Sequence, residues 1–400
     1  MVDSVTENVR TVHVFPGASS ADEYTEDDFT PHDHPTPHVA PASELTAPED
    51  VSTSEFADEV PRSADTDGSA AVRSSIFDNP AAGLTAAAHT PTVPAATTGV
   101  RGLLSRLGIR MAPSAHELAE LGRADARRQD ETVVRQATWT RAVSVLVANP
   151  KGGTGKTPTA LILGGVLASI RGGSVAVVEV ADDPGALTFR AEGNPALGLG
   201  DLMRDVDQIT NAGQLAGYTA PQTSFAAVIG STGRRPRLTG EAVVDISRVI
   251  DEFYAIRVMD SGNQPTSSAF QGAVSVADAL VIPVMNAGDS TLEAIRLLTE
   301  LRAAGGPAAA LANRAIAIRL IDGRPENAAV TDEVTRLLTE AGISTIHDIP
   351  YDRHIAERGQ ITLATLTPAT ADAFTSAAAT VVKTLQTAAR TTTNTRKVSA

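Results

Sequence analysis

The stretch that decides the fold is residues 149–157, which read NPKGGTGKT. It follows the near-continuous apolar run 142–148 (AVSVLVA), which is typical of a strand buried on both faces, and it precedes a helical pattern over 157–170. The chain has four lysines, and two of them, Lys151 and Lys156, lie in this loop beside glycines. A glycine-rich loop between a buried strand and a helix surrounds phosphate with backbone N–H groups, so the stretch predicts a phosphate-binding loop.

Each residue type in this loop has a task in nucleotide binding. The glycines let the backbone N–H groups turn inward, and the start of the following helix adds further donors and a favourable dipole. Lys156 is expected to reach the β- and γ-phosphates, and the Thr157 hydroxyl is expected to bind Mg²⁺. The residues expected to bind the nucleotide are Gly152, Gly153, Thr154, Gly155, Lys156, Thr157 and Pro158.

Strand and helix patterns alternate after this loop. Such alternation predicts an α/β fold, a doubly wound and mainly parallel sheet flanked by helices, of the P-loop NTPase type. Further strands are expected at 174–180, 225–229, 255–259, 279–284, 315–320 and 345–349, and the clearest helices at 291–304, 330–341 and 369–389.

Charge is distributed very unevenly along the chain. Residues 1–98 carry 17 acidic residues and 3 arginines, which accounts for the whole net charge of −14, and they show no sustained hydrophobic period. Such a segment cannot bury enough apolar surface to offset its chain entropy. The predicted organisation is a disordered acidic tail over 1–98, a basic helical arm over 99–141, a domain with the phosphate-binding loop over 142–390 and a flexible C-terminus over 391–400.

The two N-terminal segments leave some interpretations open. The histidines His32, His34 and His38 lie among prolines, which favours a polar flexible tract over a metal site. The arm has a short basic apolar stretch at 103–109 and a candidate helix N-cap at Ser114, with Gly122 following the helical pattern. The arm can bind a membrane surface or a partner, but the short apolar stretch favours packing on the main domain.

The composition excludes several classes of protein. There is no cysteine, which excludes disulfides and thiolate metal sites, and there is no apolar run of 18 or more residues. Residues 1–10 lack the basic segment followed by an apolar segment with which a secretory signal begins. We therefore expect a cytoplasmic protein without a transmembrane segment.

The loop departs from the ordinary phosphate-loop pattern, because Pro150 stands where that pattern has glycine. What remains, Lys-Gly-Gly-x-Gly-Lys-Thr, is the deviant Walker A motif, and over about residues 142–388 the sequence resembles the MinD/ParA family of ATPases. The resemblance implies binding of ATP and Mg²⁺, slow hydrolysis stimulated by a partner, and an ATP-bound homodimer. It also implies that Lys151 crosses the dimer interface to the nucleotide of the other copy, where it adds positive charge during transfer.

Acidic residues follow two of the predicted strands. Asp260 ends one strand and precedes Ser261-Gly262, which resembles the Walker B motif of the family and implies a role in holding Mg²⁺. The second strand ends in Glu179, and the family's Asp-x-Asp aligns in two ways. One register pairs Glu179 with Ala181, and the other pairs Ala181 with Asp183. Loss of the second acid predicts slow hydrolysis unless Asp182 or Asp183 replaces it, and we favour Asp183.

These considerations give the remaining expected site residues. Lys151, Asp183 and Asp260 are expected to be catalytic, and Thr157, Asp260 and Glu179 to bind the metal. By the family resemblance, Pro350, Tyr351 and Asp352 lie against the adenine, with the backbone contributing more than the side chains.

Partners are the least constrained part of the prediction. The arginines Arg234, Arg235 and Arg237 suggest either a nonspecific DNA contact or a solvated loop, and the balanced charge of 99–400 favours the solvated loop. A protein partner is expected to bind the tail or the arm. The basic arm, Arg171-Gly172 and Gly185-Ala186-Leu187 with Arg190 also resemble the MinD-like ATPases associated with actinobacterial type VII secretion. Positioning or partition, secretion-associated regulation and a non-hydrolysing scaffold are therefore the competing roles.

Overall fold

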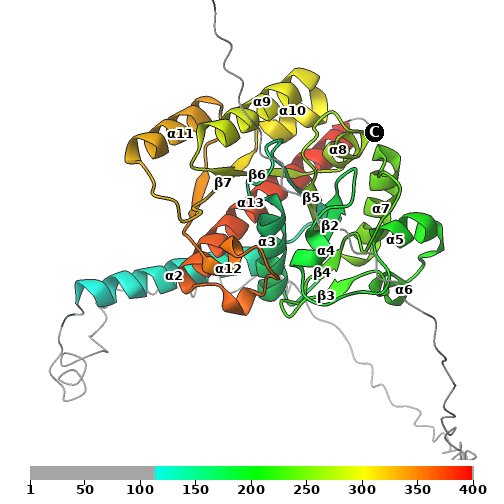
Figure 1. Cartoon of the computed structure of the whole chain (residues 1–400), viewed down its shortest axis with the longest axis horizontal. Helices are drawn as coiled ribbons and strands as arrows, with labels where there is room; N and C mark the ends of the chain where they lie inside the picture. The colour runs from blue at the N-terminus through cyan, green and yellow to red at the C-terminus, as the bar shows by residue number, and fades with distance from the viewer. Residues whose placement is uncertain (1–111, 113, 399–400) are drawn as a thin grey trace, which may run out of the picture. The chain divides into compact units, whose positions relative to one another are not determined.

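The computed structural model describes residue 112 and residues 114–398 (Figure 1). The acidic tail, its histidines His32, His34 and His38, and the basic apolar stretch 103–109 lie outside the described residues. The predictions for these segments are therefore not tested.

One eight-stranded sheet forms the centre of the domain, with the order β3-β4-β2-β5-β1-β6-β7-β8 (Figure 1). Among the described strands, every pairing is parallel except that of β3 with β4. This confirms the predicted doubly wound, mainly parallel sheet. The strands are β1 Val143–Val147, β2 Val175–Val180, β3 Ala220–Pro221, β4 Ala227–Ile229, β5 Ile256–Ser261, β6 Ala279–Met285, β7 Ile316–Leu320 and β8 Ile346–Ile349.

Helices cover both faces of the sheet because the side chains of a buried strand point alternately to either side. In β1, Val145 and Val147 join the core under α2, α3, α4, α12 and α13, whereas Leu146 joins the core under α5 to α11. The first set is α2 Ala115–Gln136, α3 Lys156–Arg171, α4 Leu187–Arg190, α12 Arg353–Ala356 and α13 Pro368–Val398. The second set is α5 Leu199–Asp205, α6 Ala212–Ala216, α7 Gly240–Phe253, α8 Ser268–Ser275, α9 Gly288–Ala304, α10 Gly306–Ala312 and α11 Ala328–Glu340. Short 3₁₀ turns occur at Val206–Gln208 and Leu363–Thr365.

Several element boundaries differ from the predicted ones; for example, α9 begins at Gly288 rather than at 291, and β5 ends at Ser261 rather than at 259. The strand expected from Phe225 begins at Ala227, because Phe225 has φ +68° and its N–H closes a turn onto the carbonyl of Gln222. The arm helix is capped by Ser114 as predicted, but it passes through Gly122 and ends only at Gln136. The last helix extends to Val398, past the predicted end at 389.

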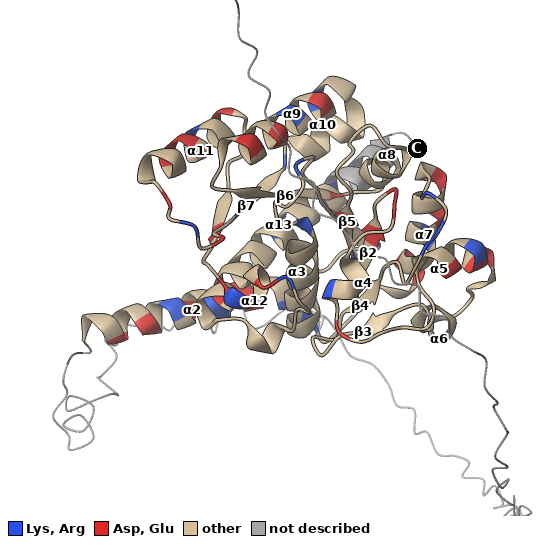
Figure 2. Ribbon diagram, in the orientation of Figure 1, with Lys and Arg blue, Asp and Glu red and all other residues tan. Residues whose placement is uncertain are grey.

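Packing explains why α2 continues past its glycine. Acidic and basic residues are interspersed along α2 (Figure 2), and Arg127 reaches Asp372 of α13 at 3.0 Å. At the other end, Nη1 of Arg171 donates to the carbonyl oxygens of Val134 (2.8 Å) and Ala137 (3.0 Å). Tertiary contacts of this kind outweigh the roughly 1 kcal/mol that a glycine costs in a helix. Residues 115–136 thus form an arm packed on the main domain, as the sequence favoured.

None of the helices described in residues 114–398 is both long enough and apolar enough to cross a bilayer.

Helix α3 approaches the sheet very closely, and this sets the position of its first turn. A Cβ at Gly164 would lie 2.3 Å from Cγ2 of Val177 in β2, so only glycine fits at this contact. The carboxyl ends of β1, β2 and β5 lie beside that first turn, because the register places Asp260 between Val147 and Glu179. The fold therefore gathers the phosphate loop and two acidic strand ends at one edge.

Candidate functional site

The phosphate loop connects β1 to α3, and its backbone needs glycine at two positions. Gly153 has φ +79° and Gly155 has φ +88°, which are left-handed values that other residues seldom adopt. A Cβ at Gly155 would also lie 3.2 Å from both Cδ atoms of Leu320. The loop turns directly into the first turn of α3, where unpaired backbone N–H groups and the helix dipole favour an anion.

Asn149 anchors this loop to distant parts of the chain. Its side chain is buried, and Nδ2 donates to the carbonyl oxygens of Pro283 (2.9 Å) and Ser290 (3.2 Å). Its Oδ1 accepts a hydrogen bond from the backbone N–H of Lys151 at 2.9 Å. This anchoring role of Asn149 could not be predicted from the sequence, because the two carbonyl groups to which it donates lie more than 100 positions away.

The two lysines of the loop lie in different surroundings. Lys156 is 8% exposed, and its Nζ donates to the Lys151 carbonyl at 3.1 Å and to Oδ1 of Asn263 at 2.5 Å. Burial lowers the pKa of the Lys156 ammonium to about 8, and the Asp260 carboxylate opposes this shift. Such an ammonium is poorly solvated, so an anion entering beside it would gain much of the missing stabilisation.

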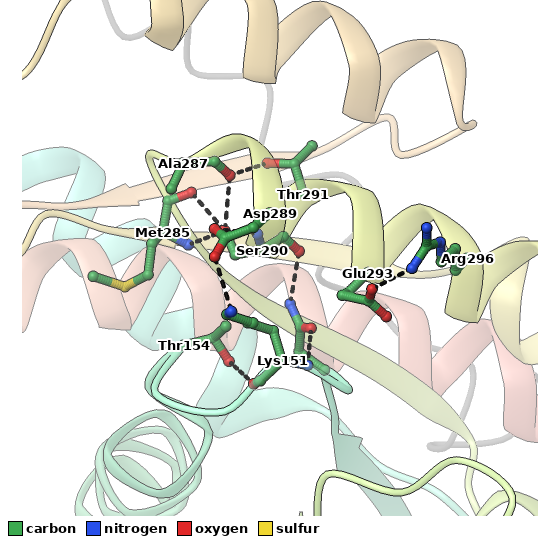
Figure 3. A network of polar contacts seen from close by, with 10 residues as sticks. Lys151, Thr154, Met285, Ala287, Asp289, Ser290, Thr291, Glu293 and Arg296 are labelled. Carbon is green, nitrogen blue, oxygen red and sulfur yellow. Dashed lines mark hydrogen bonds and ion pairs between the residues drawn. The ribbon is translucent and has the colours of Figure 1, made fainter. Parts of the chain in front are cut away.

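Lys151 points away from this interior. Its side chain is 45% exposed, and its Nζ forms an ion pair at 2.9 Å with Oδ2 of Asp289, in the first turn of α9 (Figure 3). The hydrogen bond from Lys151 holds the pKa of Asp289 below its usual range, and the Ser290 N–H lowers it further. Exposed pairs of this kind contribute little to stability, so Lys151 is easily released.

An oxygen-rich cluster lies where β2 and β5 end. Thr157 Oγ1 donates to Asp260 Oδ2 at 2.7 Å, whereas Asp260 Oδ1 and Glu179 Oε2 are buried without a hydrogen-bond partner. Burial raises the pKa of Asp260 to about 7, the charge of Glu179 adds to the shift, and the Thr157 hydrogen bond and Lys156 oppose it. Buried carboxylate oxygens without partners fit a hard cation such as Mg²⁺.

The number of protein ligands in this cluster is small. Among the described residues, no group of three or more His, Cys, Asp or Glu side chains could hold a metal ion. Mg²⁺ suits such a site because it keeps several waters and shares its coordination with substrate phosphates. Thr157, Asp260 and Glu179 are the residues that would hold it.

Arg235 is the largest surprise of the site. The sequence favoured a solvated loop for the arginines 234, 235 and 237, but the Arg235 side chain is 1% exposed. Its Nη2 contacts Oε1 of Glu179 at 2.9 Å, and Glu179 is equally buried. The solvated-loop interpretation is therefore wrong for Arg235, because a buried carboxylate 56 positions earlier in the sequence supplies its counter-charge.

The loop 181–186 borders the same site. Ala181 packs against Gly262, where an added Cβ would lie 3.4 Å from the Ala181 Cα. The Asp182 carbonyl accepts from the Leu238 N–H at 3.0 Å. The Asp183 side chain is 63% exposed and contacts Arg237 at 3.2 Å. Neither acid contacts Thr157 or Asp260 in this arrangement, but both line the cavity described below.

The residues after β8 divide into two groups. Asp352 is buried, and its carboxylate accepts from the N–H groups of His354 (3.0 Å) and Thr367 (2.8 Å), so it caps α12 and ties the loop to the start of α13. The Tyr351 ring lies over Gly323, whose Cβ would be 2.6 Å from the ring. The Asp352 side chain is therefore engaged within the protein, which leaves its backbone to contact a ligand.

A cavity of about 690 Å³ joins these parts. Predicted residues that do not line it are Lys151, Gly152, Thr154 and Tyr351. Predicted residues that line it are Gly153, Gly155, Lys156, Thr157, Pro158, Glu179, Asp183, Asp260, Pro350 and Asp352. The structure thus brings most of the predicted set around one cavity, and it adds Asn263, which the sequence analysis did not single out.

Solved structures of similar fold include several ATPases. The chain is similar to the ParA family ATPase from Chlorobium tepidum TLS, with 18% identity over 62% of this chain and 98% of that chain and a TM-score of 0.46. It is similar to the MinC:MinD cell division protein complex of Aquifex aeolicus, with 18% identity over 59% and 94% and a TM-score of 0.46. It is also similar to the cell division ATPase MinD of Pyrococcus furiosus, with 17% identity over 60% and 99% and a TM-score of 0.45.

The family assignment rests on a sequence model rather than on these likenesses. No curated protein matches the chain. The model of the CobQ/CobB/MinD/ParA nucleotide binding domain matches residues 145–362, which is more than half of the 400 residues. The chain therefore belongs to the CobQ/CobB/MinD/ParA nucleotide-binding family.

Proposed function

We propose that this protein is an ATP-binding and ATP-hydrolysing switch that dimerises when ATP is bound. The observation that supports this most is the contrast between the two lysines of the phosphate loop. Lys156 is buried and lines the cavity, whereas Lys151 is exposed and does not line it. The Lys151 ammonium is exposed beside the cavity of its own chain but does not line it, so it is available to the nucleotide of a second copy.

Each part of the cavity has a proposed task. The loop 152–157 surrounds the phosphates with backbone N–H groups, Pro158 borders them without an N–H of its own, and Lys156 supplies the charge. Thr157, Asp260 and Glu179 hold Mg²⁺, which when bound neutralises charge on the phosphate oxygens. The segment 350–352 borders the adenine mainly through its backbone, because the Asp352 carboxylate caps helices.

Hydrolysis needs a group that orients the attacking water, and Ala181 lacks one. We propose that Asp183 takes this task, with Asp182 as the alternative, since both line the cavity. Asp183 must leave Arg237 to do so, and their contact is exposed on both sides. Lys151 of the other copy would stabilise charge that develops during transfer. We therefore expect slow hydrolysis until a partner rearranges this loop.

Lys151→Ala tests the dimer. ATP-dependent association, measured by light scattering, is expected to fall, while binding of a fluorescent ATP analogue is retained. Lys383→Ala, which removes an exposed lysine from α13, is the matched control and should change neither measurement. Unchanged association of Lys151→Ala with ATP would overturn the dimer proposal.

Phosphate release tests the catalytic assignment. Asp183→Asn is expected to lower the rate of ATP hydrolysis and to leave ATP affinity unchanged, whereas Asp182→Asn should have the smaller effect. The reverse order would assign the water to Asp182. Absence of phosphate release by the wild-type protein, alone and with its partner, would instead support a non-hydrolysing scaffold.

The proposed cellular role is intracellular positioning or DNA partition in the cytoplasm. The tail (1–98) and the arm (99–141) are the segments proposed to bind a protein partner. Gel retardation of nonspecific DNA with ATP, repeated at rising salt, tests the DNA contact, because phosphate contacts weaken steeply with salt. Retardation that does not depend on ATP, or that does not weaken as the salt concentration rises, would contradict this role.

A further inference from the structure

We propose that Arg235 is a positioning residue for the proposed ATPase. It holds Glu179 and the loop 181–186 in one arrangement, and Mg²⁺-dependent nucleotide binding depends on that arrangement. The inference rests on the proposed function, because it concerns how the residues of that site are oriented.

The first part of the argument is the carboxylate of Glu179. Arg235 Nη2 and Ser231 Oγ both donate to its Oε1, and Arg235 Nε donates to Ser231 Oγ at 2.8 Å. Oε1 is therefore fully engaged, while Oε2 is buried without a partner. Glu179 is paired in register with Asp260, so its carboxylate lies beside the metal cluster. Because Arg235 engages Oε1, Oε2 is the oxygen that remains free for the metal ion.

The second part is the loop that follows β2. Arg235 Nη1 donates to the carbonyl oxygen of residue 182 at 2.7 Å, and Nη2 donates to those of residues 181 (2.8 Å) and 183 (3.2 Å). A guanidinium is planar and rigid, so donors on one group fix their acceptors relative to each other. Glu179 and the loop that carries Asp183 are thus linked through a single side chain.

Stability alone does not account for this arrangement. A buried ion pair contributes little net stability, because desolvation of both charges offsets their attraction. The neighbouring Arg234 and Arg237 are exposed and have none of these contacts with Glu179. What distinguishes Arg235 is that Glu179 and the carbonyl groups of residues 181–183, which belong to or flank the proposed metal and water-orienting residues, are among its partners; its other acceptors are Ser231 Oγ and the carbonyl oxygen of Pro236.

Arg235→Met and the matched control Arg234→Met test the inference. Binding of a fluorescent ATP analogue is measured by titration with Mg²⁺ and with EDTA. For Arg235→Met we expect the Mg²⁺-dependent gain in affinity to fall roughly 10- to 100-fold, as for other residues that orient metal ligands. Binding in EDTA, which depends on the phosphate loop, should remain as in the wild type, and Arg234→Met should match the wild type in both conditions.

A double-mutant cycle with Glu179→Gln shows whether Arg235 acts through the carboxylate. Combining the two changes is then expected to cost little more than either alone, because both remove the same arrangement. Effects that add independently would overturn the inference, as would a normal Mg²⁺ gain in Arg235→Met.

Two milder variants keep the test decisive if Arg235→Met does not fold. Arg235→Lys keeps the charge but has a single nitrogen, so it cannot bond Glu179 and the three carbonyls together, and it should lose part of the Mg²⁺ gain. Ser231→Ala removes one donor to Glu179 and should have a smaller effect of the same kind. If both keep the full Mg²⁺ gain, the inference is wrong. If the wild-type chain binds no nucleotide in either condition, the proposed function is wrong, and the inference falls with it.

Discussion

The phosphate loop (149–157) and the loop 181–186 border the same cavity, yet they are held in different ways. The turn of the phosphate loop takes its shape from glycines at positive φ and from the helix that it begins, which are properties of its own sequence, while the Asn149 side chain ties the start of the loop to β6 and α9. The loop 181–186 is fixed by Arg235, which lies about 50 residues further along the chain. A loop that depends on its own sequence resists distant changes, whereas a loop held from outside can be released by one.

The largest effect should come from the phosphate loop. Lys156→Ala removes the buried ammonium and should lower ATP affinity about 100-fold or more, because a charge-assisted contact with phosphate contributes up to about 3 kcal/mol. Isothermal titration calorimetry measures this, with Lys383→Ala as the matched control. If the ATP affinity of Lys156→Ala were close to that of Lys383→Ala, the contrast between the phosphate loop, which is shaped by its own sequence, and the loop 181–186, which is held by Arg235, would be contradicted.

Asn149→Ala removes the buried side chain that ties the phosphate loop to β6 and α9. We expect the free energy of unfolding to fall by about 2 kcal/mol, because buried donors and acceptors lose their partners. Denaturant unfolding gives the measurement. The control is Asn313→Ala, since Asn313 is exposed and accepts from Arg302 at the surface. Equal stability of the two variants would mean that the loop is held by its backbone alone.

Gly185→Ala tests the second loop from inside. A Cβ there would lie 2.9 Å from Oε2 of Glu179, the oxygen that has no partner. We expect the Mg²⁺-dependent part of ATP binding to weaken about tenfold, with binding in EDTA unchanged. Gly233→Ala is the control, because nothing lies within 4 Å of a Cβ at that position. An equal loss in both conditions would indicate general distortion instead.

The smallest effect is expected for Arg237→Ala. Arg237 is 70% exposed, and among the described residues its ion-pair partner is the exposed carboxylate of Asp183, so water replaces the contact easily. Thermal unfolding and ATP affinity should both stay as in the wild type. A large loss of affinity would show that this outer arginine, and not Arg235 alone, holds the loop.

The same contrast explains what could be predicted from the sequence. The sheet and the phosphate loop follow from apolar runs, glycine positions and helix starts, which are local patterns, and the structure has them where expected. Burial of Arg235 could not be predicted, because no local feature distinguishes it from Arg234 and Arg237. The contacts of Asn149 could not be predicted either, since its partners Pro283 and Ser290 lie near it only in the folded chain. Functional side chains that are satisfied by long-range contacts therefore escape pattern reasoning.

The central place of β1 has a consequence for how the protein is made. β1 lies between β5 and β6, and Val143 pairs with Ile256, more than 100 residues later in the chain. At about 5–20 residues per second, a ribosome needs roughly 6–23 s to supply that neighbour after β1 has been synthesised. The strands that flank β1, which are β5 and β6, are therefore synthesised well after the phosphate loop, and α13, which packs on α3, is synthesised later still. A nascent chain can complete the cavity beside the phosphate loop only after β5, β6 and α13 have been synthesised.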